Sequence, residues 1–417
     1  MNRSTAKLSA TSGTAASTAP GRIPAAARTV LKLLSSMRHG SLTLHLPDGS
    51  VQRFGESASP HATLHLNNWN AFTGALKSGD IGFAESFIDG DWTTPDLAML
   101  LRVLVQNRAE VDRVIFGSWI GRLAYRIKHL LQRNTRTNSK KNIHAHYDLG
   151  NDFYALWLDP TMNYSSALFG GDLSQTLSQA QNAKVRRALQ QVDLKPGSRV
   201  LEIGCGWGAL AEMATKEHGA HITGVTLSTE QLDFARARMQ RQGVAAQADL
   251  RLQDYRDIAD GPFDAVCSIE MIEAVGQGFW PTYFATVARM LKPGGKACIQ
   301  SIVIADALFE RYLESTDFIQ QYIFPGGCLP SPSEFKAQAQ AAGLEVVQEH
   351  AFGHDYALTL QRWREAFLAQ REQVLTLGFD QRFMHIWEFY LCYCEAAFME
   401  ENIDVLQYTL QKPHAAA

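Results

Sequence analysis

The 417-residue chain lacks several features that would assign it to a class at once. No apolar run is long enough to cross a bilayer, which takes about 20 residues. The formal net charge is −3, so bulk charge gives no sign of nucleic acid as a partner. The six cysteines are scattered, and the only close pair, Cys392-x-Cys394, has no second pair or histidines at ligand spacing. We therefore predict no metal site and expect a reducing, cytoplasmic environment.

Two stretches lack acidic residues. Residues 1–28 are rich in Ser, Thr, Ala and Gly, a composition that resembles a transit peptide but also fits a disordered tail, and we expect a disordered tail and lead-in over 1–39. Residues 121–141 carry seven basic side chains, with leucine and isoleucine at helical spacing. This pattern predicts that the linker 116–142 forms a basic amphipathic helix in peripheral contact with an anionic membrane. A solvated linker helix, or one that pairs with an acidic part of the protein, fits the pattern equally well.

Residues 40–115 predict a small α+β domain, which we interpret as a candidate for lipid association. The pattern contains a hairpin, because two alternating runs flank the turn Pro47-Asp48-Gly49. The expected elements are three strands and two helices, at Leu42–Leu46, Val51–Phe54, Ala62–Leu66, Asn68–Ser78 and Asp96–Asn107.

A glycine-rich loop organises the rest of the chain. An apolar strand ends at Ile203, three glycines follow at alternate positions (Gly204, Gly206 and Gly208), and a helical pattern comes next. Glycines allow tight turns and close approach to a ligand, and a helix N-terminus offers free N–H groups. Dinucleotide enzymes have G-x-G-x-x-G, whereas this spacing is G-x-G-x-G, preceded by Glu202. The pattern is typical of S-adenosylmethionine (SAM) methyltransferases with a Rossmann-like α/β sheet.

Later strands of this sheet supply further candidates. The strand His221–Thr226 ends without an acid, and the next leads to Asp254 and Tyr255, either of which we expect to meet adenine. The strand Phe263–Ile269 ends at two carboxylates, Glu270 and Glu273. Open α/β sheets bind substrates at this edge, so we expect at least one of the two to be catalytic.

Three segments together resemble the cyclopropane-fatty-acyl-phospholipid synthase family: His146-Tyr147-Asp148-Leu149-Gly150-Asn151, Leu201–Gly208, and Tyr322-Ile323-Phe324-Pro325-Gly326-Gly327-Cys328-Leu329-Pro330. The likeness runs from about His144 to Leu410 and includes plant-type features. It implies a class I SAM methyltransferase domain with helical insertions over 143–410, before a tail at 411–417. It also implies transfer of a methylene unit from SAM to the double bond of an acyl chain in a membrane phospholipid, which forms a cyclopropane. Family members can be dimeric, so the resemblance allows a homodimer.

The resemblance also implies site residues. In the family, a bound bicarbonate removes the proton that lets the ring close, and the positions that match its ligands are Ser166, Glu273, Gln300, Ile302 and Tyr356. The positions that match the SAM site are Tyr164, Ser165, Gly204, Gly206, Thr226, Leu227, Gln231, Asp254 and Tyr255.

Three positions depart from the bacterial pattern. Ser166 stands where the family usually has cysteine, and Gln300 and Ala274 stand where the bacterial enzymes have histidine, although plant-type members also carry glutamine at the position of Gln300. Methylation of the acyl chain without ring closure, which gives a methyl- or methylene-branched lipid, is therefore an alternative product. A methyltransferase for a soluble small molecule and a non-catalytic lipid-binding protein remain as rival classes.

Overall fold

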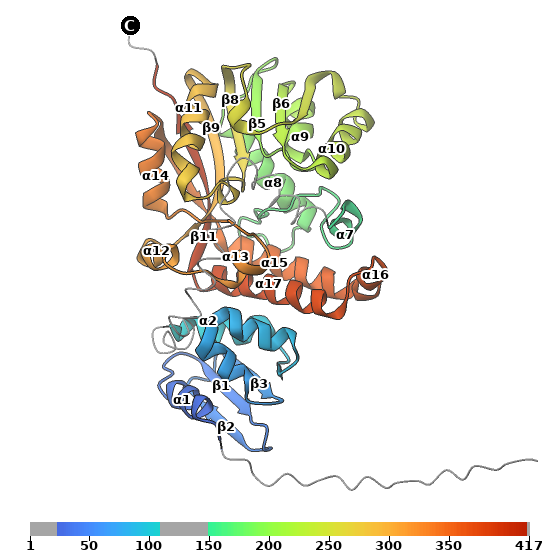
Figure 1. Cartoon of the computed structure of the whole chain (residues 1–417). Coiled ribbons are helices and arrows are strands. Elements are labelled where there is room, and N and C mark those ends of the chain that lie inside the picture. Colours follow the sequence, from blue (N-terminus) through green and yellow to red (C-terminus); the bar gives the residue numbers. More distant parts are fainter. Residues whose placement is uncertain (1–22, 109–148, 415–417) are drawn as a thin grey trace, which may run out of the picture.

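The computed structural model describes residues 23–108 and 149–414. Within these ranges the chain forms two sheets, one in the small N-terminal domain and one in the catalytic domain, with a layer of C-terminal helices between them (Figure 1). The predicted basic linker, the boundary at residue 115 and the residues His146–Asp148 of the first family motif lie outside the described ranges.

The small domain has a four-stranded sheet in the order β2-β1-β3-β4. The first two strands form the predicted antiparallel hairpin, and β3 lies parallel to β1. The elements are α1 (Ala25–Leu34), β1 (Ser41–His45), β2 (Val51–Phe54), β3 (His61–Leu66), α2 (Asn70–Ile88), β4 (Trp92–Thr93) and α3 (Leu97–Gln106).

One expectation for this region was wrong, and another was incomplete. The lead-in to residue 39 is not disordered throughout, because α1 buries Ala27, Val30 and Leu34 against the rest of the domain. The helix expected around Asn68–Ser78 is the first part of α2, which breaks at Gly79, where φ is 65° and ψ is −136°. Glycine adopts such backbone angles without strain, and a second helical part, which was not predicted, follows it to Ile88.

The catalytic sheet has seven strands in the order β10-β11-β9-β8-β5-β6-β7. β5 to β9 run parallel, whereas β11 is antiparallel to both of its neighbours. The strands are β5 (Arg199–Ile203), β6 (His221–Thr226), β7 (Ala248–Leu252), β8 (Phe263–Ile269), β9 (Leu291–Ile304), β10 (Glu345–Ala351) and β11 (Ile403–Gln411). The sheet reverses its strand order at β5 and β8, so the carboxyl ends of these strands form a crevice where α/β proteins bind ligands.

Helices cover both faces of this sheet (Figure 1). One face packs against α8 (Leu177–Gln190), α9 (Ala209–His218) and α10 (Thr229–Arg241), and the other against α11 (Trp280–Met290) and α14 (Pro332–Ala341). The remaining α-helices are α7 (Asn151–Ala155), α12 (Asp306–Leu313), α13 (Phe318–Tyr322), α15 (Gly353–Ala369), α16 (Arg371–Thr376) and α17 (Gln381–Met399). Short 3-10 turns follow Val244, Asp254, Met271 and Gly276.

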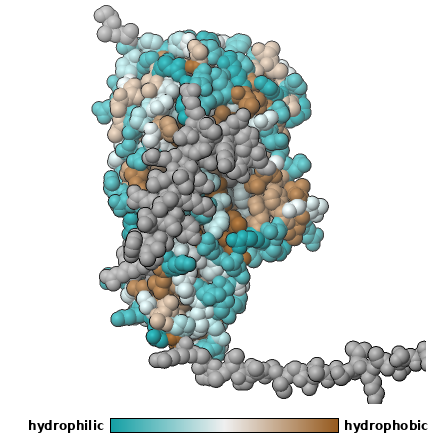
Figure 2. All heavy atoms as spheres, in the orientation of Figure 1, coloured by the Kyte–Doolittle hydropathy of each residue, from teal (hydrophilic) through white to brown (hydrophobic). Residues whose placement is uncertain are grey.

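The helical layer joins the two domains. α17 packs on α3, and Arg102 of α3 forms an ion pair with Glu400 at the end of α17, with a nitrogen–oxygen distance of 2.8 Å. Figure 2 shows apolar residues gathered at the outer end of this layer, where Leu375 and Leu377 are exposed. The layer places the small domain directly below the carboxyl-terminal edge of the catalytic sheet.

Candidate active site

A cavity of about 160 Å³ opens at the carboxyl ends of β5, β6 and β8. Every residue that the sequence predicts to bind SAM lines it: Tyr164, Ser165, Gly204, Gly206, Thr226, Leu227, Gln231, Asp254 and Tyr255. Ser228 caps the helix after β6, since Ser228 Oγ accepts from the backbone N–H of Gln231 over 3.3 Å. The structure thus brings these residues together in one place.

The glycine loop is shaped as a cradle. Gly204, Gly206 and Gly208 all have positive φ, at 85°, 49° and 83°. A Cβ atom at Gly204 would lie 2.9 Å from Met271 Cγ, so a side chain there would clash as well as strain the backbone. The loop therefore keeps the floor of the cavity open.

The cavity has the chemistry that SAM requires. Buried Glu202 Oε2 and Tyr255 Oη line it and have no hydrogen-bond partner among the described residues. A cationic, hydroxyl-bearing nucleoside ligand would satisfy such atoms. Asp254 is engaged by Arg256, whose Nε lies 2.8 Å from its carboxylate, and the same guanidinium lies over the ring of Tyr255, 5.7 Å from its centroid.

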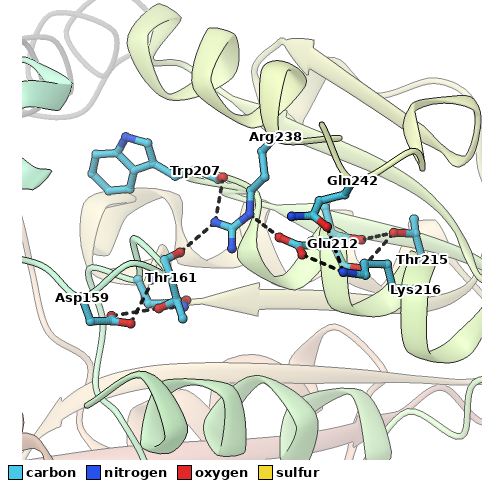
Figure 3. Close-up of polar contacts among 10 residues, drawn as sticks. Asp159, Thr161, Trp207, Glu212, Thr215, Lys216, Arg238 and Gln242 are labelled. Carbon is cyan, nitrogen blue, oxygen red and sulfur yellow. Dashed lines mark hydrogen bonds and ion pairs between the residues drawn. The ribbon is translucent and has the colours of Figure 1, made fainter. Parts of the chain in front are cut away.

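A polar network ties the segment before Tyr164 to α9 and α10 (Figure 3). Arg238 donates to Glu212 Oε2 over 2.5 Å and to the carbonyl of Thr161 over 2.7 Å. Asp159 accepts from the backbone N–H and the hydroxyl of Thr161, over 3.0 and 2.8 Å. Because Thr161 lies three residues before Tyr164, this network positions one wall of the cofactor cavity.

A second cavity, of about 370 Å³ and mainly apolar, meets the first. It extends from the small domain, where Leu34, Leu42 and Phe72 line it, to the end of β8. Among the residues that the structure describes, three line both cavities, namely Tyr164, Glu270 and Ala274. A group bound in one cavity would meet a group bound in the other at these side chains.

Glu270 is the centre of the polar cluster at this junction. Its Oε1 accepts from the backbone N–H of Ser166 over 2.8 Å and from Gln300 Nε2 over 2.7 Å. Its Oε2 accepts from the hydroxyl of Tyr356 over 2.6 Å. Burial raises the pKa of the Glu270 carboxyl, while the charge of Lys184 and the three donors act to lower it.

Gln300 is oriented by a chain of two donors, Arg187 and Gln407. Arg187 Nη1 donates to Gln407 Oε1 over 2.6 Å, and Gln407 Nε2 donates to Gln300 Oε1 over 2.9 Å. A guanidinium can only donate, so each amide in the chain has one allowed orientation. The Gln300 amide nitrogen is thereby directed to Glu270.

Glu273 has different partners. Its Oε1 accepts from the backbone N–H of Ile302 over 2.5 Å, and its buried Oε2 has no hydrogen-bond partner among the described residues. Burial and the nearby charge of Glu270 raise the pKa of Glu273 to about 8. The two carboxyls therefore differ in their partners: Glu270 accepts from three donors, whereas Glu273 accepts from one.

The predicted bicarbonate ligands do not form one anion site. Ser166, Gln300 and Tyr356 donate to the Glu270 carboxylate, and Ile302 donates to Glu273. The donors are thus engaged by carboxylates of the chain itself, and a bicarbonate does not fit the cluster as it stands.

Sequence reasoning missed two residues of this cluster, Lys184 and Gln407. Lys184 of α8 is fully buried and donates to Ser165 Oγ over 2.5 Å. Burial lowers its pKa to about 8, against the charges of Glu270, Asp159 and Glu202. A lysine between Ala180 and Ala188 on the buried face of a helix was the available signal. Gln407 gave a weaker one, as a polar residue within an apolar strand.

The sheet order and the glycine-lined cavity define a class I SAM-dependent methyltransferase. The profile of the mycolic acid cyclopropane synthetase family matches residues 134–408, and the chain belongs to this family. A structure of mycolic acid cyclopropane synthase CmaA1 complexed with SAH and CTAB has a TM-score of 0.62 and 32% sequence identity, and it covers 66% of this chain and 98% of that one.

Two curated relatives extend the likeness to the small domain. Tuberculostearic acid methyltransferase UfaA1 of Mycobacterium tuberculosis is 38% identical over 382 residues, which are 89% of this chain and 83% of that protein. Cyclopropane-fatty-acyl-phospholipid synthase of Escherichia coli strain K12 is 34% identical over 364 residues, which are 85% of this chain and 89% of that protein.

Proposed function

We propose that the enzyme adds the methyl carbon of SAM to the double bond of an unsaturated phospholipid acyl chain and closes a cyclopropane ring. The observation that carries the proposal is the junction of the two cavities at Tyr164, Glu270 and Ala274. One cavity has a glycine cradle suited to SAM, and the other is apolar and elongated, as an acyl chain requires.

The apolar cavity gives the small domain a role in this proposal. α1, α2 and the sheet supply its distal part, through side chains such as Leu34, Leu64 and Phe72. If an acyl chain extended into this domain, a double bond in the middle of the acyl chain would lie near Glu270. This arrangement favours a long-chain lipid over a soluble small molecule.

The chain's own residues supply the conditions that the chemistry needs. When bound, SAM supplies an electrophilic methyl group, and uptake of that group by the alkene leaves a positive charge on the acyl chain. Tyr164, Phe324 and Leu360 line the apolar cavity and shield that charge from water, which would otherwise hydrate it. A proton acceptor beside the methyl carbon then allows the ring to close.

Methylation without ring closure is the second candidate product. Two observations favour it. The chain is 38% identical to a tuberculostearic acid methyltransferase, and it has Gln300 and Ala274 at the positions where the bacterial synthases have histidine. A hydride shift followed by loss of a proton from the chain would give such a product. The position of the acceptor beside the cofactor cavity favours loss of the proton from the methyl group, and hence the ring.

Product analysis tests the proposal. Purified enzyme is incubated with SAM and liposomes of a monounsaturated phospholipid, and the acyl chains are examined by mass spectrometry and proton NMR. We expect a gain of one CH₂ with high-field ring protons. Vinylic or branched-methyl signals at the same mass would favour the second candidate, and the absence of any gain, with SAM still bound, would contradict a lipid substrate.

We further propose peripheral contact with an anionic membrane, supported by the basic composition of residues 121–141. Among the described residues, no helix has the length and apolar character that crossing a bilayer requires. Flotation with anionic and with neutral liposomes tests this contact, because an electrostatic contact should be seen with the anionic vesicles and weaken as salt is added.

A further inference from the structure

We infer that the side chain of Glu270 takes the place of a bound bicarbonate and is itself the proton acceptor of the reaction. The inference rests on the proposed function, since it names the base of that same site. The family resemblance predicts that Ser166, Gln300 and Tyr356 bind an external anion, and in this structure all three donate to the Glu270 carboxylate instead.

The first support is the donor set itself. Ser166, Gln300 and Tyr356 come from three distant segments, and all three donate to the Glu270 carboxylate over 2.6 to 2.8 Å. A carboxylate and a bicarbonate present the same pair of oxygens on one planar carbon, so one can replace the other in such a set. A second anion beside Glu270 would find these donors occupied and would be repelled by the charge.

The second support is position. Glu270 lines both the cofactor cavity and the apolar cavity, where the methyl carbon and the alkene would meet. Oε1 accepts two hydrogen bonds, which uses both of its lone pairs, whereas Oε2 accepts one, from Tyr356. One lone pair of Oε2 therefore remains to take a proton.

The third support is the backbone at Glu270. Its φ is 50°, in the left-handed region that glycine adopts freely and a glutamate adopts with strain. Strained residues of this kind persist where the surrounding structure holds them, and they cluster at functional sites. Here the three donors hold the side chain, so the strain is offset by the contacts that would make it a base.

Glu273 is the rival acceptor, and its surroundings argue against it. It lines the apolar cavity but not the cofactor cavity, so it lies farther than Glu270 from the place where the methyl carbon and the alkene would meet. Its carboxyl accepts from the backbone N–H of Ile302, and its pKa is raised to about 8, which makes it a poorer acceptor of a proton near neutral pH because less of it is ionised. The neighbouring charge of Glu270 contributes to that raised pKa, which divides the two roles between the pair.

The chemical step balances without an external base. A C–H bond of the newly attached methyl group breaks, and its electron pair forms the second ring bond to the cationic carbon of the chain. The proton goes to Glu270 Oε2, so a cation and a carboxylate become a neutral cyclopropane and a neutral carboxylic acid. Glu270 returns the proton to solvent before the next turnover.

Three variants test the inference. Glu270→Gln keeps the shape of the side chain but cannot accept the proton. Glu270→Gly removes the carboxylate, so that its three donors are free to bind an anion, and glycine tolerates the positive φ at this position. Glu349→Gln is the control, because it makes the same chemical change at an exposed ion pair with Lys336. Each is assayed with SAM and monounsaturated phospholipid liposomes in CO₂-free buffer, without and with added sodium bicarbonate. Calorimetry with S-adenosylhomocysteine checks that the cofactor cavity is intact.

We expect the wild type and Glu349→Gln to turn over equally fast with and without bicarbonate. Glu270→Gln should lose at least about 100-fold in kcat under both conditions, the lower end of what a general base contributes. Glu270→Gly should lose as much in CO₂-free buffer and recover at least about 10-fold with bicarbonate. In ¹³C NMR with labelled bicarbonate, Glu270→Gly should bind the anion and the wild type should not.

Opposite results would overturn the inference. A wild type that stops in CO₂-free buffer and resumes with bicarbonate would show that the anion is the base, and so would bicarbonate bound to the wild type in the NMR experiment. A Glu270→Gln variant that keeps the rate of the wild type would show that Glu270 is not the base. Failure of the proposed function is distinguishable, because the wild type would then make no product in either buffer.

Discussion

The side-chain amides of Gln407 and Gln300 form a fully buried hydrogen bond of 2.9 Å, donated by Gln407 Nε2 to Gln300 Oε1. Gln407 lines neither cavity, yet it determines which end of the Gln300 amide faces Glu270. It is therefore a positioning residue for the acceptor at the cavity junction.

The substitution Gln407→Glu should reverse that orientation. The introduced carboxylate would still accept from Arg187, but two acceptors would then face each other until the Gln300 amide turned over and presented its oxygen to Glu270. We expect kcat to fall about 10-fold, with KM for SAM unchanged, and the acid limb of the pH–rate profile to move to higher pH. Steady-state kinetics across pH measure all three.

Gln348→Glu is the matched control for this change, because Gln348 is exposed on the neighbouring edge strand β10. It should leave the three quantities unchanged. A Gln407→Glu variant with lower stability but the same pH profile would reduce Gln407 to a packing role.

Lys184 should set the pH at which the enzyme loses activity in acid. Its charge acts to lower the pKa of Glu270, so Lys184→Met should raise that pKa further. A base works only when ionised, and the acid limb of the kcat profile should therefore move to higher pH. Lys195→Met, at an exposed position, should leave the limb in place. An unmoved limb in Lys184→Met would contradict electrostatic coupling between Lys184 and Glu270.

Glu273 should make the fold less stable as the pH rises. Its pKa is about 8 in the folded protein, against 4.5 for an ordinary glutamate, so between these pH values the folded state binds more protons than the unfolded chain. Rising pH then favours unfolding, by up to about 1.4 kcal/mol per pH unit from this group. The contribution is fully present below pH 4.5 and lost as the pH rises through 8.

Urea unfolding of the wild type and of Glu273→Gln, repeated at steps of about one pH unit from roughly pH 5 to roughly pH 8, measures this contribution. Glutamine keeps the acceptor for Ile302 but does not titrate. The difference in unfolding free energy between the two proteins should therefore change steadily with pH in favour of the variant. A constant difference would mean that the pKa of Glu273 is not raised.

Local patterns predicted much of the fold, and the family resemblance predicted residues that line the cofactor cavity. The strands His221–Thr226 and Phe263–Ile269 have the predicted bounds, because each is a short segment rich in β-branched or apolar residues that ends at a change of composition. The residues matched to SAM share one cavity, since most of them lie on loops that leave neighbouring strands. Such features depend on chain segments of a few residues.

The cluster around Glu270 depended on contacts that no local pattern contains. Ser166 and Tyr356 are 104 and 86 residues away from Glu270 in the chain, so their convergence appears only in the folded structure. The family resemblance assigned the anion's donors but gave no sign that a second glutamate would accept from them. α1 was missed for a related reason, because its buried face is satisfied only by the domain it joins.

Arg238 gives a test of the wall of the cofactor cavity. Arg238→Met removes the contacts to Glu212 and to the carbonyl of Thr161, so the segment that leads to Tyr164 loses its attachment to α10. We expect a loss of stability of about 1–3 kcal/mol, as for a buried polar group left without its partner. Affinity for S-adenosylhomocysteine should fall about 10-fold, which corresponds to about 1.4 kcal/mol.

The two effects are separable by thermal unfolding and calorimetry. Arg241→Met changes the same residue type on the exposed side of the same helix and should alter neither quantity much. If Arg238→Met lost stability alone, the network would hold α9 to α10 without shaping the cavity. A loss of affinity in excess of the control shows instead that the cavity wall depends on Arg238 for its position, because Arg238 also donates to the carbonyl of Trp207, over 3.4 Å, and Trp207 lines the cavity as Tyr164 and Ser165 do.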